Sequence, residues 1–484
     1  MSLRVQPLIY EIHAWPWLTA LSRRCGRPVT LGSIPAEEYD SLAATGFDAI
    51  WLMGVWERSL AARGLAQRPM VLDEYRRALP DLKAEDVVGS AYAIHRYEVD
   101  AYLGGPDGLA RCREQLARRG MRLLLDYVPN HVAVDHPWLT ARPECLIHAD
   151  AAALAADPVT FFQGPRPGEV IAHGRDPYFP AWIDTAQINI FAPAARELWR
   201  STLAEIAQQC DGVRCDMAML LLNRIFAATW RGSVGPTPEN EFWSEIIPAI
   251  KAIHPDFVFI AEAYWGTEQE LLTLGFDYAY DKGLYDLLLI GKVEEIWSAL
   301  IRPIDFQAHL LHFIENHDET RAAVAFGPQR SMAAAAVSLL IPGARLLYEG
   351  QLAGWRVKTP VQLGRRLEEA SDLSIQPFYR VLLGEASQPI YHTGTYTPLD
   401  TIAPDGVLTF CWTLGSDWRL VVVNYTDQPV DASLTLPDLL RPASFASLRE
   451  LFSDASAVSG GERLSERMLH LHLPAFGVQV WQPR

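Results

Sequence analysis

The sequence predicts an α/β protein: a (β/α)8 (TIM) barrel with a small lobe inserted after the third strand and a C-terminal antiparallel β domain. Three observations predict it. Short β-rich apolar runs alternate with longer helical stretches eight times along the chain. The interval between the third and fourth runs is about 60 residues longer than one strand–helix unit needs. After about residue 388 the alternation gives way to strand-like runs separated by turns.

The eight predicted barrel strands are apolar runs that end in polar residues. They lie at residues 8–13, 47–53, 122–127, 212–217, 257–262, 276–280, 309–315 and 345–349. Helical segments at 108–119, 194–209 and 241–253 separate some of them. A doubly wound open sheet would alternate in the same way, but no Gly-rich phosphate-binding loop follows any of these runs. Its absence favours the barrel.

The spacing also predicts how the chain divides into domains. The barrel is expected at residues 1–131 and 185–388, with the inserted lobe at 132–184 overhanging its mouth. A second long loop, at 54–100, should lie on the same face. The C-terminal runs at 407–412, 419–425, 432–436, 469–473 and 478–481 predict a β-sandwich within 389–484.

Composition narrows the function classes. The chain is 49% apolar and 21% charged, as in ordinary globular proteins. Its formal charge of −16 disfavours nucleic acid and anionic membranes as partners. No apolar run is long enough to span a bilayer, no signal peptide is recognisable, and the six cysteines form no Cys-x-x-Cys pair. We therefore expect a cytoplasmic protein, with its oligomeric state open.

Carboxylates stand at or just beyond four predicted strand ends: Asp126, Asp216, Glu262 and Asp318. In a barrel of this type, reactive groups lie where strands end and loops begin. A single Asp after a strand is most often a helix cap or a turn residue. Four ionised carboxylates at one mouth would repel one another, so their convergence indicates a site with nearby cations or shared protons.

Four segments resemble the signature regions of the α-amylase family of glycoside hydrolases. They are DYVPNH at 126–131, GVRCD at 212–216, AE at 261–262 and ENHD at 315–318, and AQIN at 186–189 is similar to a further short motif. The four occur in order on the third, fourth, fifth and seventh predicted strands. The resemblance covers about residues 5–385 and implies the same barrel, with a C-terminal β domain.

The resemblance implies three catalytic carboxylates. Asp216 corresponds to the nucleophile, Glu262 to the general acid/base, and Asp318 to a third carboxylate that holds sugar hydroxyls and favours ring distortion. The substrate-binding residues that it implies are Arg214, His131, His317, Tyr92 and Asp126.

Each of these five residues has an implied role. Arg214 would keep the nucleophile ionised, and Asp126 would orient Arg214. His131 and His317 would bind hydroxyls of the sugar that is cleaved, and Tyr92 would stack against it.

Physical chemistry supports this division of labour. Arg214 lies two residues before Asp216 on one strand, so both side chains point to the same face. Acidic neighbours should raise the pKa of Glu262 and keep it protonated for the acid step. Retaining glycoside hydrolysis needs two carboxyl groups about 5–5.5 Å apart with separated pKa values.

Two departures from the family pattern bear on metal binding and substrate length. Residues 217–221, MAMLL, stand where many endo-acting amylases have a Lys-His pair, which disfavours long-starch endo-hydrolysis and a calcium site. Asn130 stands where a calcium ligand would be, but the inserted lobe has few acidic residues. We therefore predict no metal and no cofactor, with calcium as the alternative.

The resemblance implies a retaining glycoside hydrolase that acts on α-glucosidic bonds of maltooligosaccharides or related α-glucans through a covalent glycosyl-enzyme. A transglycosylase of the same family is one alternative. A non-catalytic carbohydrate-binding protein on the same barrel is another, and an unrelated metal-dependent lyase is a third. The expected partner is an α-glucan or oligosaccharide.

Overall fold

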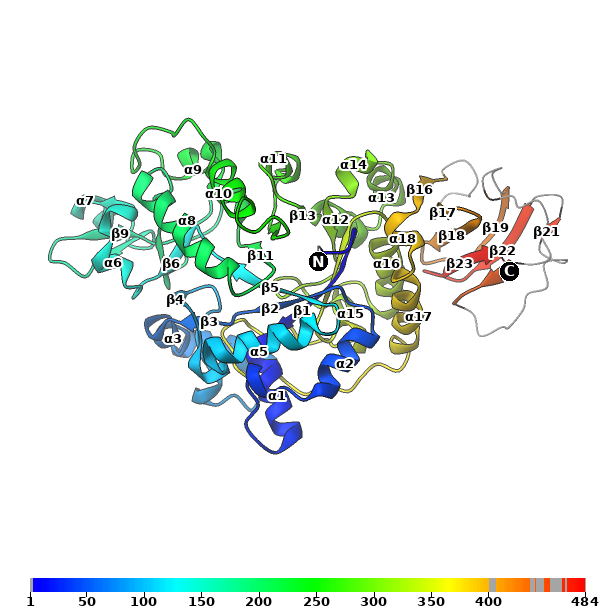
Figure 1. The fold of residues 1–484 in the computed structure, drawn as a ribbon, viewed down its shortest axis with the longest axis horizontal. Coiled ribbons are helices and arrows are strands. Elements are labelled where there is room, and N and C mark those ends of the chain that lie inside the picture. The colour runs from blue at the N-terminus through cyan, green and yellow to red at the C-terminus, as the bar shows by residue number, and fades with distance from the viewer. Residues whose placement is uncertain are drawn as a thin grey trace.

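The computed structural model describes residues 3–399, 406–435, 440, 448–452, 464–465 and 468–483. Eight parallel strands close into a barrel in the order β1-β15-β14-β13-β12-β11-β5-β2 (Figure 1). The barrel strands are β1 (Leu8–His13), β2 (Ala49–Met53), β5 (Arg122–Tyr127), β11 (Gly212–Cys215), β12 (Val258–Ala261), β13 (Tyr278–Tyr280), β14 (Leu310–His312) and β15 (Ala344–Tyr348). The predicted barrel is confirmed, and the closed strand order excludes an open sheet.

Helices follow the barrel strands and lie around them (Figure 1). The longer ones are α1 (Ala14–Cys25), α2 (Ala36–Ala44), α5 (Gly105–Ala117), α8 (Pro193–Ala207), α10 (Phe242–Lys251), α12 (Lys282–Ile290), α13 (Val293–Leu300), α16 (Pro328–Leu340) and α17 (Gln376–Ala386). The shorter ones along the barrel and after it are α9 (Asn223–Thr229), α11 (Glu268–Thr273), α14 (Ile304–Gln307), α15 (Ala322–Ala325) and α18 (Ile390–Thr393). In α8, Ala195, Trp199, Leu203 and Ile206 recur every three or four residues and are all buried, so one face packs on the strands.

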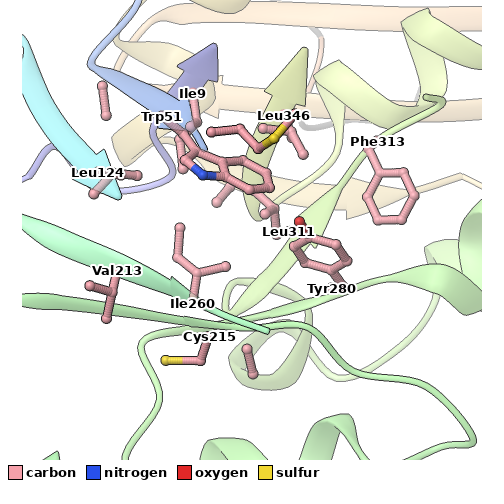
Figure 2. Close-up of a cluster of buried hydrophobic side chains, with 14 of the residues drawn as sticks. Ile9, Trp51, Leu124, Val213, Cys215, Ile260, Tyr280, Leu311, Phe313 and Leu346 are labelled. Carbon is pink, nitrogen blue, oxygen red and sulfur yellow. The ribbon is translucent and has the colours of Figure 1, made fainter. Parts of the chain in front are cut away.

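Successive side chains along each barrel strand point alternately into the barrel and outward toward the surrounding helices. Figure 2 shows the Trp51 indole and the Tyr280 ring near the barrel centre, with Cys215 on the far side of its strand. Arg214, between two outward residues of β11, therefore points inward. The same alternation brings Asp216 to the inner side.

The third strand is followed by an inserted lobe, as predicted. At its base, β6 (His131–Ala133) pairs antiparallel with β10 (Thr185–Gln187). The lobe contains β7 (His148–Ala149), β8 (Phe161–Gln163), β9 (Val170–Ala172), α6 (Trp138–Ala141) and α7 (Ala151–Ala156). In Figure 1 the lobe and the C-terminal strands lie at opposite ends of the molecule.

The loop after β2 has structure of its own. It holds β3 (Trp56–Arg58), α3 (Leu60–Ala66), α4 (Pro69–Ala78) and β4 (Ile94–Val99). The two strands pair antiparallel. This excursion brings α4 and Tyr92 to the barrel mouth, where both matter for the site.

Two antiparallel sheets follow the barrel, which confirms the predicted C-terminal β domain. One has the order β16-β17-β18-β23-β20 and the other β19-β22-β21. The strands are β16 (Thr395–Pro398), β17 (Val407–Leu414), β18 (Asp417–Asn424), β19 (Val430–Thr435), β20 (Leu448–Glu450), β21 (Leu464–Ser465), β22 (Met468–Leu473) and β23 (Val478–Pro483). Residue 436, the last of one predicted strand, lies outside the described residues. The Trp412 indole N–H donates to the carbonyl of Leu340 at the end of α16 at 2.7 Å, which ties this domain to the barrel.

None of the helices in the described parts of the chain combines the length and the apolar character that crossing a bilayer requires.

Candidate active site

Three of the four carboxylates predicted at strand ends converge on one buried guanidinium. Arg214 Nη1 lies 2.6 Å from Asp216 Oδ1, and its Nη2 lies 2.8 Å from Glu262 Oε2 and 3.9 Å from Asp318 Oδ2. Asp216 and Glu262 directly follow β11 and β12, which are neighbours in the barrel. The three carboxylates that the sequence resemblance implied as catalytic are therefore gathered around a single cation.

Aromatic rings enclose this cation. The guanidinium carbon of Arg214 lies 5.3 Å from the ring centroid of Tyr92, 5.4 Å from that of Trp51 and 5.7 Å from that of Tyr280. The side chain of Arg214 is 1% exposed. In such a dry setting an ion pair is much stronger than at the surface, so Arg214 stabilises negative charge on the adjacent carboxylates.

Glu262 has the environment of a proton donor. Burial raises the pKa of Glu262 to about 7; Arg214 opposes the rise, and Asp216 and Asp318 reinforce it. The main-chain N–H of Met217 donates to Oε2 at 2.5 Å, and the Tyr264 hydroxyl donates to Oε1 at 2.8 Å. A carboxyl group with a pKa near neutrality can give and take a proton at working pH. The predicted direction agrees, but burial is a larger cause than the acidic neighbours that sequence reasoning invoked.

The contact from Met217 depends on an unusual backbone. Met217 has φ 44° and ψ 45°, the left-handed region that residues with a Cβ rarely adopt. This turn directly follows Asp216 and aims the main-chain N–H of Met217 at Glu262. Strain of this kind concentrates at functional sites.

Asp318 is presented by a turn beyond β14. Asn316 Oδ1 accepts hydrogen bonds from the main-chain N–H groups of Asp318 at 2.9 Å and Glu319 at 3.0 Å. The strand itself ends at His312, whereas the sequence predicted it to reach residue 315. The side chain of Asp318 is 45% exposed, so it faces the open mouth of the barrel.

His317 is held between two carboxylates. Its Nδ1 lies 2.5 Å from Glu11 Oε1, and its Nε2 lies 3.0 Å from Asp318 Oδ2 and 2.7 Å from the Tyr92 hydroxyl. Burial would lower the pKa of His317, but Asp318 and Glu11 raise it to about 10. The imidazole is therefore a cation at neutral pH. In turn, although desolvation would raise the pKa of Asp318, His317 holds it well below its usual value.

Asp126 does not contact Arg214 directly, which corrects the orienting role that the resemblance implied. Its Oδ1 accepts from the Trp51 indole N–H at 3.2 Å and its Oδ2 from the main-chain N–H of Gly54 at 2.9 Å. No hydrogen bond or ion pair joins Asp126 and Arg214, both of which are described. Asp126 acts instead by fixing Trp51, whose ring lies against the guanidinium.

The two remaining predicted residues also lie at the mouth. Tyr92 stacks on the His317 ring, with centroids 5.3 Å apart and an interplanar angle of 22°. His131 is buried; burial lowers its pKa, and the nearby charge of Asp216 works against that fall. Its ring lies 5.1 Å from that of Trp182 in the inserted lobe.

Sequence reasoning missed several residues of the site. Glu11 is a fully buried acid in the middle of the apolar strand β1, a signal that could have been noticed. Tyr264 follows Glu262 by two residues, and exposed Trp265 follows by three. Trp265 packs edge-on against Tyr178 of the lobe, with ring centroids 4.9 Å apart, although these two rings are 43% and 68% exposed. Exposed aromatic faces of this kind suit the flat faces of sugar rings.

The surroundings of Asn130 do not fit a calcium cage. Its Oδ1 accepts a hydrogen bond from Gln187 Nε2 at 3.0 Å, and its Nδ2 lies 3.2 Å from His131 Nδ1. Ca²⁺ is held by carboxylate, Asn/Gln amide and main-chain carbonyl oxygens, but the amide oxygen of Asn130 already accepts from Gln187 and these contacts bring no carboxylate.

Curated relatives carry amylase and maltosyltransferase names. No protein-family model matches the sequence. The chain is 27% identical to the α-amylase MalA of Haloarcula japonica over 419 residues, which are 82% of this chain and 53% of that protein. It is 25% identical to the α-1,4-glucan:maltose-1-phosphate maltosyltransferase of Rhodospirillum rubrum over 291 residues, 58% of this chain and 36% of that protein. The chain thus spans about half the length of the curated relatives it matches, or less.

Solved structures share the whole fold. The α-amylase of Geobacillus thermoleovorans, complexed with acarbose, matches with a TM-score of 0.68 at 18% identity, covering 100% of this chain and 99% of that one. The maltogenic α-amylase AmyB of Thermotoga neapolitana matches with a TM-score of 0.68 at 18% identity, covering 99% and 98%. At 18% identity, the solved structures show only that the fold is shared. The curated relatives show similarity in sequence. The chain is therefore similar in sequence to α-amylases and shares their fold.

Proposed function

We propose that this chain is a retaining glycosidase that acts on α-glucosidic bonds of maltooligosaccharides or related α-glucans. The observation that supports it best is the shared guanidinium: Asp216 and Glu262 both contact Arg214, at 2.6 and 2.8 Å. Two carboxyl groups bound to one guanidinium are close neighbours, as a double-displacement reaction requires. Both are paired with the same cation, and burial raises the pKa of Glu262 to about 7.

In the first step, Asp216 attacks the anomeric carbon of the bound sugar. The bond from that carbon to the glycosidic oxygen breaks, and Glu262 gives its proton to the departing oxygen. The leaving sugar departs as an alcohol, and the remaining sugar is joined to Asp216 as an ester. Glu262 is now a carboxylate, stabilised by Arg214 and by the N–H of Met217.

In the second step, Glu262 takes a proton from water while the water oxygen attacks the anomeric carbon. The ester bond to Asp216 breaks, which restores both carboxyl groups and releases a sugar with the original anomeric configuration. His317, as a cation, and Asp318, as an anion, supply a donor and an acceptor for hydroxyls of the sugar being transferred.

Transfer to a second sugar is the other candidate reaction. The exposed rings of Trp265 and Tyr178 lie beside the loop that carries Glu262, where an acceptor sugar could stack before Glu262 deprotonates it. The maltosyltransferase name of one relative is in keeping with this possibility. Hydrolysis is the reaction we propose, because water needs no further binding site.

Product chromatography tests the proposal and separates the two reactions. Purified chain would be incubated with maltose, maltotriose, maltotetraose, isomaltose, trehalose, sucrose and starch. Shorter sugars alone from maltotetraose support hydrolysis, and oligosaccharides longer than the substrate support transfer. No turnover of any α-glucoside would contradict both, and turnover abolished by EDTA would favour metal chemistry instead.

A further inference from the structure

A cavity of about 630 Å³ opens beside the Asp318 end of the site. Its walls are α4 and the segment 356–362, which follows β15, and it reaches His317 and Asp318. Neither Asp216 nor Glu262 lines it. The cavity therefore lies next to Asp318 and to one side of the other two carboxylates, and its volume suits a sugar-sized ligand.

Besides His317, an arginine or lysine cation lines this cavity at three positions: Arg77 on α4, and Arg356 and Lys358 in the segment 356–362. Besides Asp318, the cavity has one carboxylate, Glu74. Among the described residues, none of the three cations forms an ion pair with a carboxylate side chain; Lys358 Nζ donates instead to the main-chain carbonyl of Asp318. The walls thus carry more positive charge than negative, in a chain whose formal charge is −16.

Two other arginines of the same loop, in contrast, form ion pairs with carboxylates. Arg365 pairs with Asp81 at 2.9 Å and with Asp86 at 2.6 Å, and Arg366 pairs with Glu349 at 2.7 Å. The fold therefore supplies carboxylates to the arginines that follow Lys358 in this loop. Cations left unmatched around a concave surface attract anions and can form charge-assisted hydrogen bonds with them.

The wall that carries two of these cations is held in place. The Glu369 carboxylate accepts from the main-chain N–H groups of Arg356 at 2.8 Å and Val357 at 3.1 Å. Arg321 Nε donates to the carbonyl of Val357 at 3.3 Å. Because the segment is already ordered, a ligand would lose less free energy in fixing it.

We propose that this cavity binds an anionic group, a phosphate ester or a carboxylate, on the sugar that lies on the Asp318 side of the scissile bond. The preferred substrate is then an acidic α-glucan oligosaccharide. This proposal rests on the proposed function, since it needs a sugar seated between Asp216 and Glu262. Phosphate and carboxylate share the chemistry that the cations recognise, and the ligands used in the test separate them.

Calorimetric titration of the full chain carrying Glu262→Gln tests the proposal without turnover. The ligands are maltotetraose, maltotetraose with a phosphate on C6 of its non-reducing glucose, and maltotetraose with that glucose oxidised to glucuronate. At low salt we expect at least one acidic ligand to bind about tenfold more tightly than the neutral one. Added NaCl should reduce this difference in affinity. The tighter acidic ligand identifies the group.

Two variants locate the effect. Arg77→Gln combined with Arg356→Gln should abolish the preference for the acidic ligand. Arg76→Gln is the matched control: Arg76 is also on α4, but it does not line the cavity and it pairs with Asp73 at 2.6 Å. This control should keep the preference.

Equal affinity for neutral and acidic ligands would overturn the proposal, and so would a preference that survives the double variant. Failure of the proposed function has a different signature. In that case the unmodified chain would not cleave neutral maltotetraose, and the Glu262→Gln chain would not bind it.

Discussion

Arg214 contacts Asp216 and Glu262, the two carboxylates to which we assign different chemical roles. Replacing it as Arg214→Gln would leave Asp216 and Glu262 adjacent without their shared cation, and charge developing in the transition state would lose its partner. We expect kcat on maltotetraose to fall by about 10²–10³-fold. The kcat of Arg214→Lys should lie between those of the unmodified chain and Arg214→Gln, because an ammonium keeps the positive charge but cannot bridge two carboxylates. Steady-state kinetics of both variants measures this, and an unchanged kcat in Arg214→Gln would refute it.

The pH profile should follow Glu262. Its acid form is present below its raised pKa of about 7 and is lost above it, so kcat/KM should decline on the alkaline side of pH 7. Tyr264→Phe removes a hydrogen bond to the carboxylate, which favours the protonated form and should move this decline to higher pH. The profile of kcat/KM against pH for both proteins is the measurement. A decline that stays in place or moves to lower pH would show that Tyr264 does not act on this proton.

Glu11 should matter for stability in a pH-dependent way. The pKa of His317 is raised to about 10 when folded, so its charged form contributes stability that is fully present below the unfolded pKa of about 6.5 and is lost as pH rises through 10. Glu11→Gln removes one of the two carboxylates that cause this shift. The variant should be less stable by about 2 kcal/mol at pH 6, and the difference should narrow toward pH 10. Thermal unfolding across this range measures it; a difference independent of pH would contradict the account.

At the scale of elements, strand alternation was enough to predict that Arg214 and Asp216 share a face. The apolar runs placed the eight strands, with several ends shifted by a few residues; β14, for example, ends at His312 although its apolar run was predicted to reach residue 315. The contact between Glu11 and His317 joins β1 to the turn beyond β14, 306 residues away in sequence. No local pattern reports such a contact, and the extent of burial that raises the pKa of Glu262 is equally a property of the folded barrel.

The start of β11 illustrates how closely neighbouring barrel strands approach. A Cβ added at Gly212 would lie 2.6 Å from the carbonyl oxygen of Val258 and 2.8 Å from the Leu124 side chain. Gly212→Ala should therefore push strands apart beneath the site and cost about 1–3 kcal/mol. Gly235→Ala, where an added Cβ meets nothing within 4 Å, is the control. Equal thermal stability of Gly212→Ala and the control would contradict the packing described here.

At the scale of the whole molecule, the chain order of insertions decides what surrounds the barrel mouth. The inserted lobe could be predicted from sequence, because the interval between the third and fourth predicted strands is longer than one strand–helix unit needs. The cavity beside Asp318 could not be predicted in this way. Its cations come from segments about 280 residues apart in sequence, Arg77 on α4 and Arg356 after β15, and only the closed barrel brings them together.

The proposed mechanism requires that Asp216 becomes covalently bonded to the sugar while Glu262 transfers the proton. Its most direct test is mass spectrometry of the chain after reaction with a fluorinated maltosyl fluoride, whose ring fluorine slows release of the glycosyl-enzyme. We predict a mass increase of one fluorinated maltosyl group, located on the peptide that contains Asp216 and absent from Asp216→Asn. A label on another residue, or turnover of the reagent with no covalent adduct, would contradict the account.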